Sequence, residues 1–147
     1  MRITSSAFEN REQIPGKYTC NGENINPPLK FSEVPGEAKS LVLIIDDPDA
    51  PSGTWIHWIV YNISPNLREV GENSIPDDGE EGTTTFGKPG YGGPCPPSGV
   101  HRYFFKLYAL DKTLSLEKNP DKETILRNMQ GAIIAQAELI GLYTQQK

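Results

Sequence analysis

The sequence contains two histidines, His57 and His101, and each lies in a run of apolar and aromatic residues. Asp47 directly follows another apolar run, and Tyr103 lies two positions after His101. A carboxylate beside an imidazole can accept a hydrogen bond from it, fix its tautomer and raise its pKa. A protonated imidazole, a tyrosine hydroxyl and backbone N–H groups can together hold an anion. The combination of Asp47, His57, His101 and Tyr103 therefore predicts an anion-binding pocket.

The same residue types allow enzymatic hypotheses. Ser98 lies close to His101 in the sequence, but it lacks the Gly-x-Ser-x-Gly context of a strained nucleophile turn. We therefore expect no catalytic residue. Asp47, His57 and His101 match the ligand count of a facial triad that binds non-haem iron. A metal-dependent enzyme is the less favoured hypothesis, because the sequence displays no second shell to orient such ligands. We expect neither a metal nor another cofactor.

Three long apolar segments must position these residues. Their length, and the Pro, Gly and Asp residues that bound them, favour strands over helices. The predicted long strands are Ser40–Asp46, Trp55–Ile63 and His101–Leu110, and shorter ones are expected at Ile3–Ser5 and Leu29–Phe31. Strand alternation would place one set of side chains on a single face of the second strand and another on a single face of the third. These sets are Trp55, His57, Ile59 and Tyr61, and His101, Tyr103 and Phe105.

One segment near the C-terminus has a helical pattern. Asn119 is a suitable N-cap, and Pro120 suits the first helical position. Apolar residues from Ile125 to Ile133 then recur at helical spacing, and the pattern continues toward Glu138. We therefore predict one principal helix from Pro120 to Glu138 in a chain that is otherwise mainly β. Residues 139–143 could end this helix or form a last short strand.

The stretch between Ile63 and His101 shows little periodicity and is rich in glycine and proline. A long irregular segment in a compact domain is usually either disordered or functional. Its last part, Gly90–Gly99, has prolines that fix the backbone and glycines that permit close approach. This composition predicts a rigid loop that faces a ligand.

The bulk properties limit the remaining choices. A chain of 147 residues fits a single domain spanning residues 1–147, which can bury its own core. A net charge of −5 argues against a nucleic-acid partner, and no apolar run is long enough to span a membrane. The N-terminus lacks the apolar segment of a signal peptide, so we expect a cytoplasmic protein. Two cysteines favour reduced thiols, with one bridge between distant loops as the alternative.

Several short motifs together resemble one known family. They are Thr19–Gly22, Pro27–Leu29, Asp47–Pro51, Trp55–Trp58 and Gly93–Tyr103, in this order. Each is weak alone, but the set at these distances is similar to the phosphatidylethanolamine-binding protein family, and most similar to its shorter bacterial and archaeal Raf-kinase-inhibitor-like branch. The resemblance implies antiparallel β-sheets packed together, with one principal helix near the C-terminus.

The resemblance also implies a pocket for phosphate, acetate or phospholipid head groups. The residues that match the family's pocket positions are Asp47, Pro51, Trp55, His57, the backbone from Gly93 to Cys95, His101 and Tyr103. We therefore expect a non-enzymatic binding protein. The alternative is a serine protease inhibitor or a kinase-binding regulator, with Ser64–Gly99 as its contact surface. The resemblance further suggests a homodimer. Together with the tight acidic turn, it suggests a cis peptide bond between Ala50 and Pro51.

Overall fold

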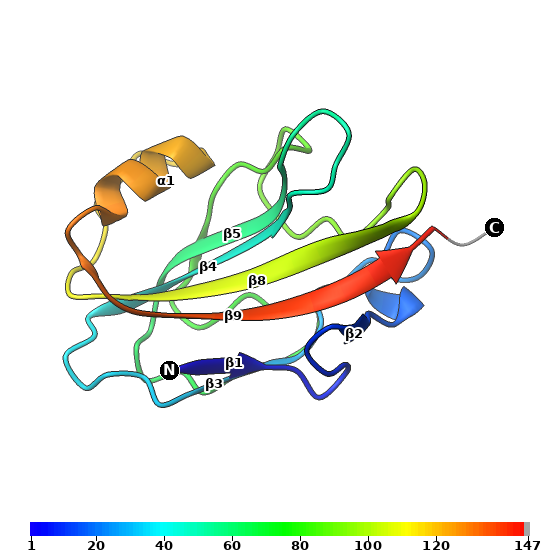
Figure 1. Cartoon of the computed structure of the whole chain (residues 1–147). Helices are drawn as coiled ribbons and strands as arrows, with labels where there is room; N and C mark the ends of the chain where they lie inside the picture. Colours follow the sequence, from blue (N-terminus) through cyan, green and yellow to red (C-terminus); the bar gives the residue numbers. More distant parts are fainter. Residues whose placement is uncertain (146–147) are drawn as a thin grey trace.

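The computed structural model describes residues 1–145, which form two β-sheets and one α-helix (Figure 1). The smaller sheet has the strand order β1-β3-β6. Its strands are β1 (Arg2–Thr4), β3 (Leu29–Ser32) and β6 (Glu69–Val70). The larger sheet has six strands in the order β2-β9-β8-β4-β5-β7. They are β2 (Glu12–Gln13), β4 (Ser40–Asp47), β5 (Trp55–Ile63), β7 (Glu80–Glu81), β8 (Val100–Leu110) and β9 (Ile133–Thr144).

The three long strands expected from the sequence are confirmed, and they lie side by side as β8, β4 and β5. All eight residues of β4 are buried, because the strand lies inside the sheet and has both faces covered. The pairings are antiparallel except that of β2 with β9, which is parallel. The fold class expected from the sequence, mainly β with packed sheets and one principal helix, is confirmed.

The helix is shorter than the sequence pattern predicted. Helix α1 spans only Lys122–Met129, and Asp121, not Asn119, is its N-cap, with its side chain accepting a hydrogen bond from the Thr124 amide at 2.8 Å. Gly131 has a φ of +78°, a left-handed conformation that ends helices. The part of the predicted helix that follows belongs to β9.

Strand β9 forms where the helix was expected because it has a partner along its whole length. Its residues pair with β8 from Ile133 opposite Leu110 to Thr144 opposite Val100. The backbone hydrogen bonds and the burial of Leu139 and Ile140 outweigh a local preference for helix, which is worth only tenths of a kcal/mol per residue.

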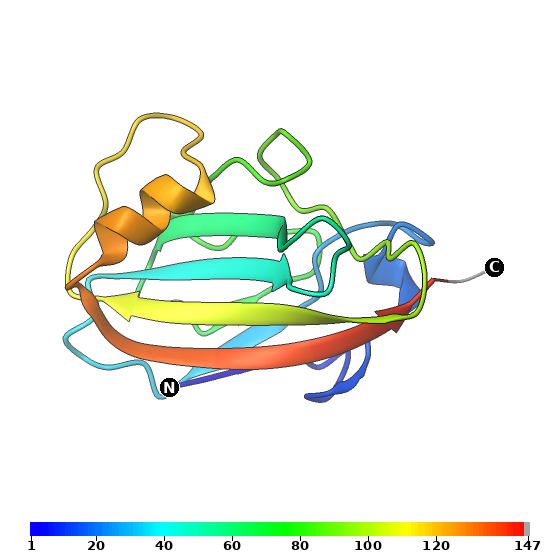
Figure 2. The same ribbon diagram turned by 45° about the horizontal axis from the view of Figure 1, so that its top comes forward.

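Two apolar clusters hold the layers together. The first lies between the sheets and includes Leu43 and Ile45 of β4, Phe105 of β8 and Phe31 of β3. The second packs Ile125 and Met129 of α1 against outward-facing residues of the large sheet. Figure 2 shows α1 on the opposite side of the large sheet from β1 and β3. A short 3-10 helix, η1 (Gly16–Tyr18), lies near the C-terminal end of β9.

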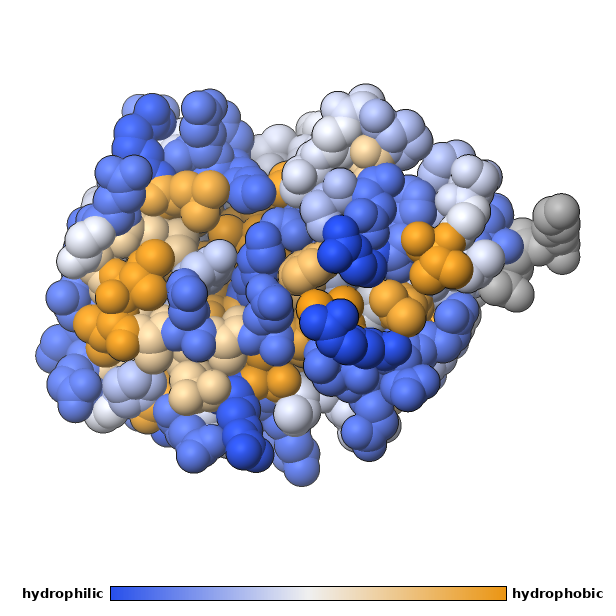
Figure 3. Space-filling model, viewed as in Figure 1, coloured by the Kyte–Doolittle hydropathy of each residue, from blue (hydrophilic) through white to orange (hydrophobic). Residues whose placement is uncertain are grey.

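The surface is mostly polar, with an apolar area at the α1 end of the molecule (Figure 3). Leu126 of α1, and Ile133 and Ile134 at the start of β9, are large apolar residues with 37%, 43% and 38% of their surface exposed. No helix in the described part of the chain is both long and apolar enough to span a membrane. The expected homodimer stays a prediction.

Candidate functional site

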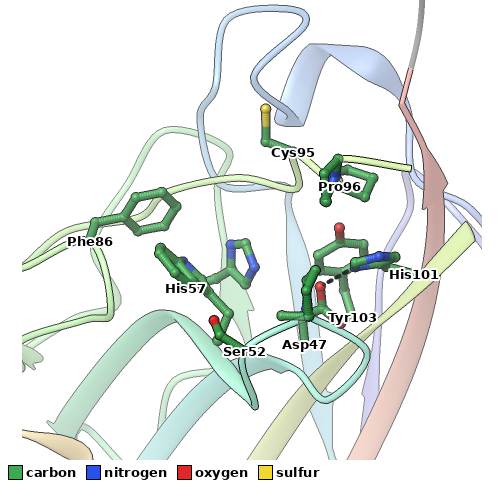
Figure 4. Close-up of a pocket in the computed structure, with 12 residues that line it drawn as sticks. Asp47, Ser52, His57, Phe86, Cys95, Pro96, His101 and Tyr103 are labelled. Atoms are coloured by element: carbon green, nitrogen blue, oxygen red, sulfur yellow. Dashed lines mark hydrogen bonds and ion pairs between the residues drawn. The ribbon is translucent and has the colours of Figure 1, made fainter. Parts of the chain in front are cut away.

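A pocket of about 260 Å³ lies at the end of the inner face of the large sheet, beside the end of β4 and the start of β8. It contains seven of the eight site residues expected from the sequence, the exception being Gly93. The lining residues are Asp47, Ala50, Pro51, Ser52, Trp55, His57, Phe86, Cys95, Pro96, Pro97, His101 and Tyr103. Figure 4 shows Asp47, His101 and Tyr103 gathered on one side of this space, with His57 and Phe86 on the other.

Asp47 and His101 form a buried pair. The Oδ2 atom of Asp47 accepts a hydrogen bond from Nδ1 of His101 at 2.6 Å, and the two side chains are 4% and 9% exposed. The other carboxylate oxygen accepts the backbone N–H of Asp49 at 2.7 Å. Because both oxygens have donors, Asp47 orients the imidazole. This confirms the orienting contact expected from the sequence, and it leaves Nε2 as the ring nitrogen free to meet a ligand.

His57 reaches the pocket because of a β-bulge. Asp46 is paired with Ile56 and Ile45 with Trp58, so His57 is an extra residue without a partner in β4. The bulge breaks the alternation that the sequence predicted for β5. Ile59 and Tyr61 pack in the cluster beneath α1, whereas His57 lines the pocket. The expectation that Trp55, His57, Ile59 and Tyr61 share one face is therefore wrong, since a bulge inserts one residue and reverses the faces beyond it.

The environment of His57 favours its neutral form. Its Nδ1 lies 2.6 Å from the carbonyl oxygen of Gly92, which can only accept, so Nδ1 carries the proton. Burial lowers the pKa of His57 below its ordinary value, and the bond to Gly92 and the charge of Asp47 oppose this only in part. At neutral pH the remaining nitrogen, Nε2, is therefore a hydrogen-bond acceptor. The sequence-based hypothesis of a positively charged His57 thus applies only to more acidic conditions.

Tyr103 supplies a free hydroxyl. Its ring stacks on His101 with centroids 6.4 Å apart and meets the His57 ring edge-on at 5.2 Å. Within residues 1–145, the hydroxyl makes no hydrogen bond to another protein group. Burial, followed by the nearby charge of Asp47, raises the pKa of Tyr103. The hydroxyl therefore keeps its proton at neutral pH and can donate it to a ligand.

The remaining wall is largely apolar. Phe86 is 43% exposed and packs edge-on against Trp55 at 5.4 Å and His57 at 5.6 Å. Pro51, Pro96 and Pro97 add rigid apolar surface. Sequence reasoning missed Ala50, Ser52, Phe86, Pro96 and Pro97. The motifs Asp47–Pro51 and Gly93–Tyr103 border or contain four of them, but Phe86 lies in an irregular segment that has no such signal.

Gly93 supports the pocket from behind. Its amide N–H donates to Oδ1 of Asn24 at 2.8 Å, so it is not available to a ligand. A side chain at this position would collide with the carbonyl oxygen of Tyr18 and with Asn24. The expectation that Gly93 contacts the ligand is therefore replaced by a packing role.

Two further expectations are wrong. Cys20 and Cys95 are joined in a disulfide, with Cα atoms 5.5 Å apart, so neither is the reduced thiol that the sequence favoured. Figure 4 shows the Cys95 sulfur directed away from the imidazoles. The chain brings the two cysteines together through the η1 turn, a tertiary contact that their separation of 75 residues does not reveal.

The Ala50–Pro51 bond is trans, as are all peptide bonds of the described residues, since the turn is accommodated without the rarer isomer.

The charged groups around the pocket are mostly paired. Arg102 binds Asp49 through two side-chain hydrogen bonds of 2.9 and 2.8 Å, so its charge is largely neutralised. On the other face of the sheet, Asp46 binds Lys106 at 3.0 Å.

Among the described residues, no group of three His, Cys, Asp or Glu side chains is arranged to hold a metal ion. The facial-triad hypothesis for Asp47, His57 and His101 therefore has no geometric support.

The fold is a β-sandwich with a small, partly apolar pocket at one end of its large sheet. The family model described as phosphatidylethanolamine-binding protein matches residues 4–144. The chain therefore belongs to the phosphatidylethanolamine-binding protein family.

Solved and curated relatives agree with this membership. A UPF0098 protein of Methanothermobacter thermautotrophicus is 53% identical over 148 residues, which cover 97% of this chain and 98% of the relative. The crystal structure of a phosphatidylethanolamine-binding protein homolog, CT736 from Chlamydia trachomatis, matches with a TM-score of 0.95 and 50% identity, covering 99% of this chain and 97% of that one. YbcL of E. coli, described as a new member of the mammalian family, matches with a TM-score of 0.91 and 30% identity, covering 99% and 98%.

Proposed function

We propose that this protein binds a small anion that still carries a proton at neutral pH, such as hydrogen phosphate, in the pocket between His57 and His101. The observation that carries the proposal is the buried Asp47–His101 pair at 2.6 Å beside the free hydroxyl of Tyr103. His101 Nε2, when protonated, and the Tyr103 hydroxyl are donors for the anion's oxygens. His57 Nε2 is an acceptor for the anion's own proton.

The polar groups favour a protonated anion over a fully ionised one. Asp47 is negatively charged when ionised, and Arg102, which lies between His101 and Tyr103 in β8, is already bound to Asp49. A bare anion would therefore meet little net positive charge, whereas hydrogen phosphate at neutral pH can donate as well as accept hydrogen bonds. The apolar walls formed by Trp55, Phe86 and the prolines exclude water and strengthen these bonds.

The pocket is a binding site in this proposal, not a catalytic one. Ser98 does not line it, and Ser52, which does, has no hydrogen bond to a histidine. A role in protease inhibition or kinase regulation stays a prediction, as does a cytoplasmic location.

The proposal is tested by titration calorimetry with inorganic phosphate and with sulfate, which carries no proton at neutral pH. We expect phosphate to bind more tightly than sulfate at pH 7. His101→Ala should weaken phosphate binding by about tenfold or more, because one charge-assisted hydrogen bond contributes about 1.5–3 kcal/mol. Ser115→Ala, an exposed change outside the pocket, is the matched control.

Measuring sulfate affinity at lower pH provides a second test of the same site. As the pH falls, His57 gains a proton and changes from acceptor to charged donor, so sulfate binding should strengthen between pH 8 and pH 5. Equal phosphate affinity in wild type and His101→Ala, or no binding of either anion at any pH, would refute the proposed function.

A further inference from the structure

The disulfide between Cys20 and Cys95 ties the wall of the pocket to a distant part of the chain. Cys95 lines the pocket, and Cys20 lies two residues after the end of η1, 75 residues earlier in the sequence. Both cysteines are exposed to solvent, whereas His57 and His101 of the neighbouring pocket are buried. A thiolate from solution can therefore approach the sulfur atoms without unfolding the sheets.

In the described part of the chain, the loop Gly90–Gly99 is held by hydrogen bonds only up to Pro94, the residue before the bridged Cys95. Tyr91 donates its hydroxyl to the Tyr18 carbonyl at 2.7 Å, and the Gly93 amide donates to Asn24 at 2.8 Å. The carbonyl of Pro94 accepts the Cys20 amide at 3.1 Å.

The next five residues, 95–99, are held differently. Within residues 1–145, this segment makes no hydrogen bond to the rest of the chain, and pairing resumes only at Val100 in β8. Besides the bridge, its attachment is the burial of Pro96. The bridge is thus the one directional link that fixes the segment carrying Pro96 and Pro97 into the pocket.

We propose that the Cys20–Cys95 bridge is a redox-reactive site for a dithiol reductant of the thioredoxin class, and that its state controls the order of the pocket wall at residues 95–99. One thiolate of the reductant attacks a bridge sulfur, giving a mixed disulfide and a free cysteine thiolate. The second thiolate of the reductant then displaces the other protein sulfur. The protein gains two electrons and two protons as Cys20 and Cys95 thiols, and the reductant leaves as its own disulfide.

The effect on the pocket is selective, because reduction leaves the other contacts in place. His101 keeps Asp47, His57 keeps the Gly92 carbonyl, and Gly93 keeps Asn24. Only the wall at residues 95–99 loses its fixed point. A ligand must then order this wall when it binds, which lowers its affinity. This last step rests on the proposed binding of phosphate, whereas the reduction and the release of the wall do not.

The experiment treats the folded protein with dithiothreitol and measures three quantities. Thiol titration should give no free thiol before treatment and two after it. The backbone ¹⁵N order parameters of Ser98 and Gly99, measured by NMR relaxation, should fall, while those of β4 and β8 stay unchanged. The affinity for inorganic phosphate should fall by ~three- to tenfold, as expected for the loss of preorganisation. Reoxidation should restore all three.

The double variant Cys20→Ser, Cys95→Ser is the matched control, because it should copy the reduced state and ignore the reductant. If the variant does not fold, the reduced and reoxidised wild type still decides the question. A bridge that resists reduction until the sheets unfold, or a reduced protein whose order parameters at Ser98 and Gly99 are unchanged, would overturn the proposal. If phosphate binds neither form, the proposed function fails, and the order parameters of Ser98 and Gly99 alone decide the redox inference.

Discussion

Asp47 and His101, which are 54 residues apart in the sequence, form a buried hydrogen bond of 2.6 Å at the edge of the pocket. The bond exists because β4 ends where β8 begins, in an antiparallel pair that aligns Asp46 with Phe104. Both side chains point to the inner face, so the carboxylate and the imidazole meet without either strand leaving its regular path.

This pair should be important for stability. Asp47→Asn replaces a charged acceptor by a neutral amide, which weakens both the bond to His101 and the bond to the Asp49 amide. We expect the free energy of unfolding to fall by about 1–3 kcal/mol, the range for disrupting a buried hydrogen-bonded group. Urea denaturation at pH 7 measures it. Asp111→Asn, at an exposed position, is the control, and an equal effect of both changes would contradict the prediction.

The free energy of unfolding should depend on pH because His57 gains a proton more readily in the unfolded chain. Its pKa is lowered by burial in the folded state, so the unfolded chain binds a proton more readily. The stabilising contribution is therefore complete above the ordinary value of 6.5 and is lost as the pH falls below it. Denaturation of wild type and His57→Gln from pH 8 to pH 5 should show a smaller loss in the variant. Parallel curves would mean that His57 titrates alike in both states.

A second acidic transition should come from Asp49. The side-chain hydrogen bonds from Arg102 lower the pKa of Asp49 to about 2 from 3.8. The pair thus contributes stability above pH 3.8 that is lost as the pH falls through about 2. The effect should be small, because the pair is solvent-accessible and screened by salt. Asp49→Asn should reduce the difference in melting temperature between pH 5 and pH 2, and high salt should do the same to the wild type.

The disulfide should contribute strongly to global stability. It joins residues 75 positions apart, and closing a loop of this length lowers the entropy of the unfolded chain by the equivalent of about 4 kcal/mol. Reduced protein should therefore unfold at a clearly lower guanidinium concentration than oxidised protein. Identical midpoints in protein with confirmed free thiols would show that the bridge constrains only the folded surface.

Gly93 should tolerate no side chain. A methyl group there would press against the backbone carbonyl of Tyr18, which cannot rotate away, and against Asn24. We expect Gly93→Ala to destabilise the protein by about 1–3 kcal/mol through overpacking. Gly36→Ala is the matched control, because a Cβ there has no neighbour within 4 Å. Thermal denaturation of both variants compares them, and a wild-type melting temperature for Gly93→Ala would disprove the packing role.

The sequence alone identified the strands that form the centre of the sheet. Apolar and β-branched runs bounded by turn residues predicted β4, β5 and β8 to within one residue at each end. Alternation along β8 then placed His101 and Tyr103 on one side, as the structure shows. These features are local, because the strand period is set by the backbone itself. Asp47, His57, His101 and Tyr103 were predicted from their residue types in and beside these strands. Pro51, Trp55 and Cys95 were expected only from the resemblance to the family.

Tertiary structure decided the features that depend on a partner far away in the sequence. The bulge that turns His57 into the pocket exists only in the register between β4 and β5. The segment after Gly131 became a strand because β8 offered backbone partners along its full length. The contact between Cys20 and Cys95, and the position of Phe86 over His57, depend on how two irregular loops pack. Local propensities of tenths of a kcal/mol per residue cannot predict these outcomes, since many long-range contacts formed together outweigh them.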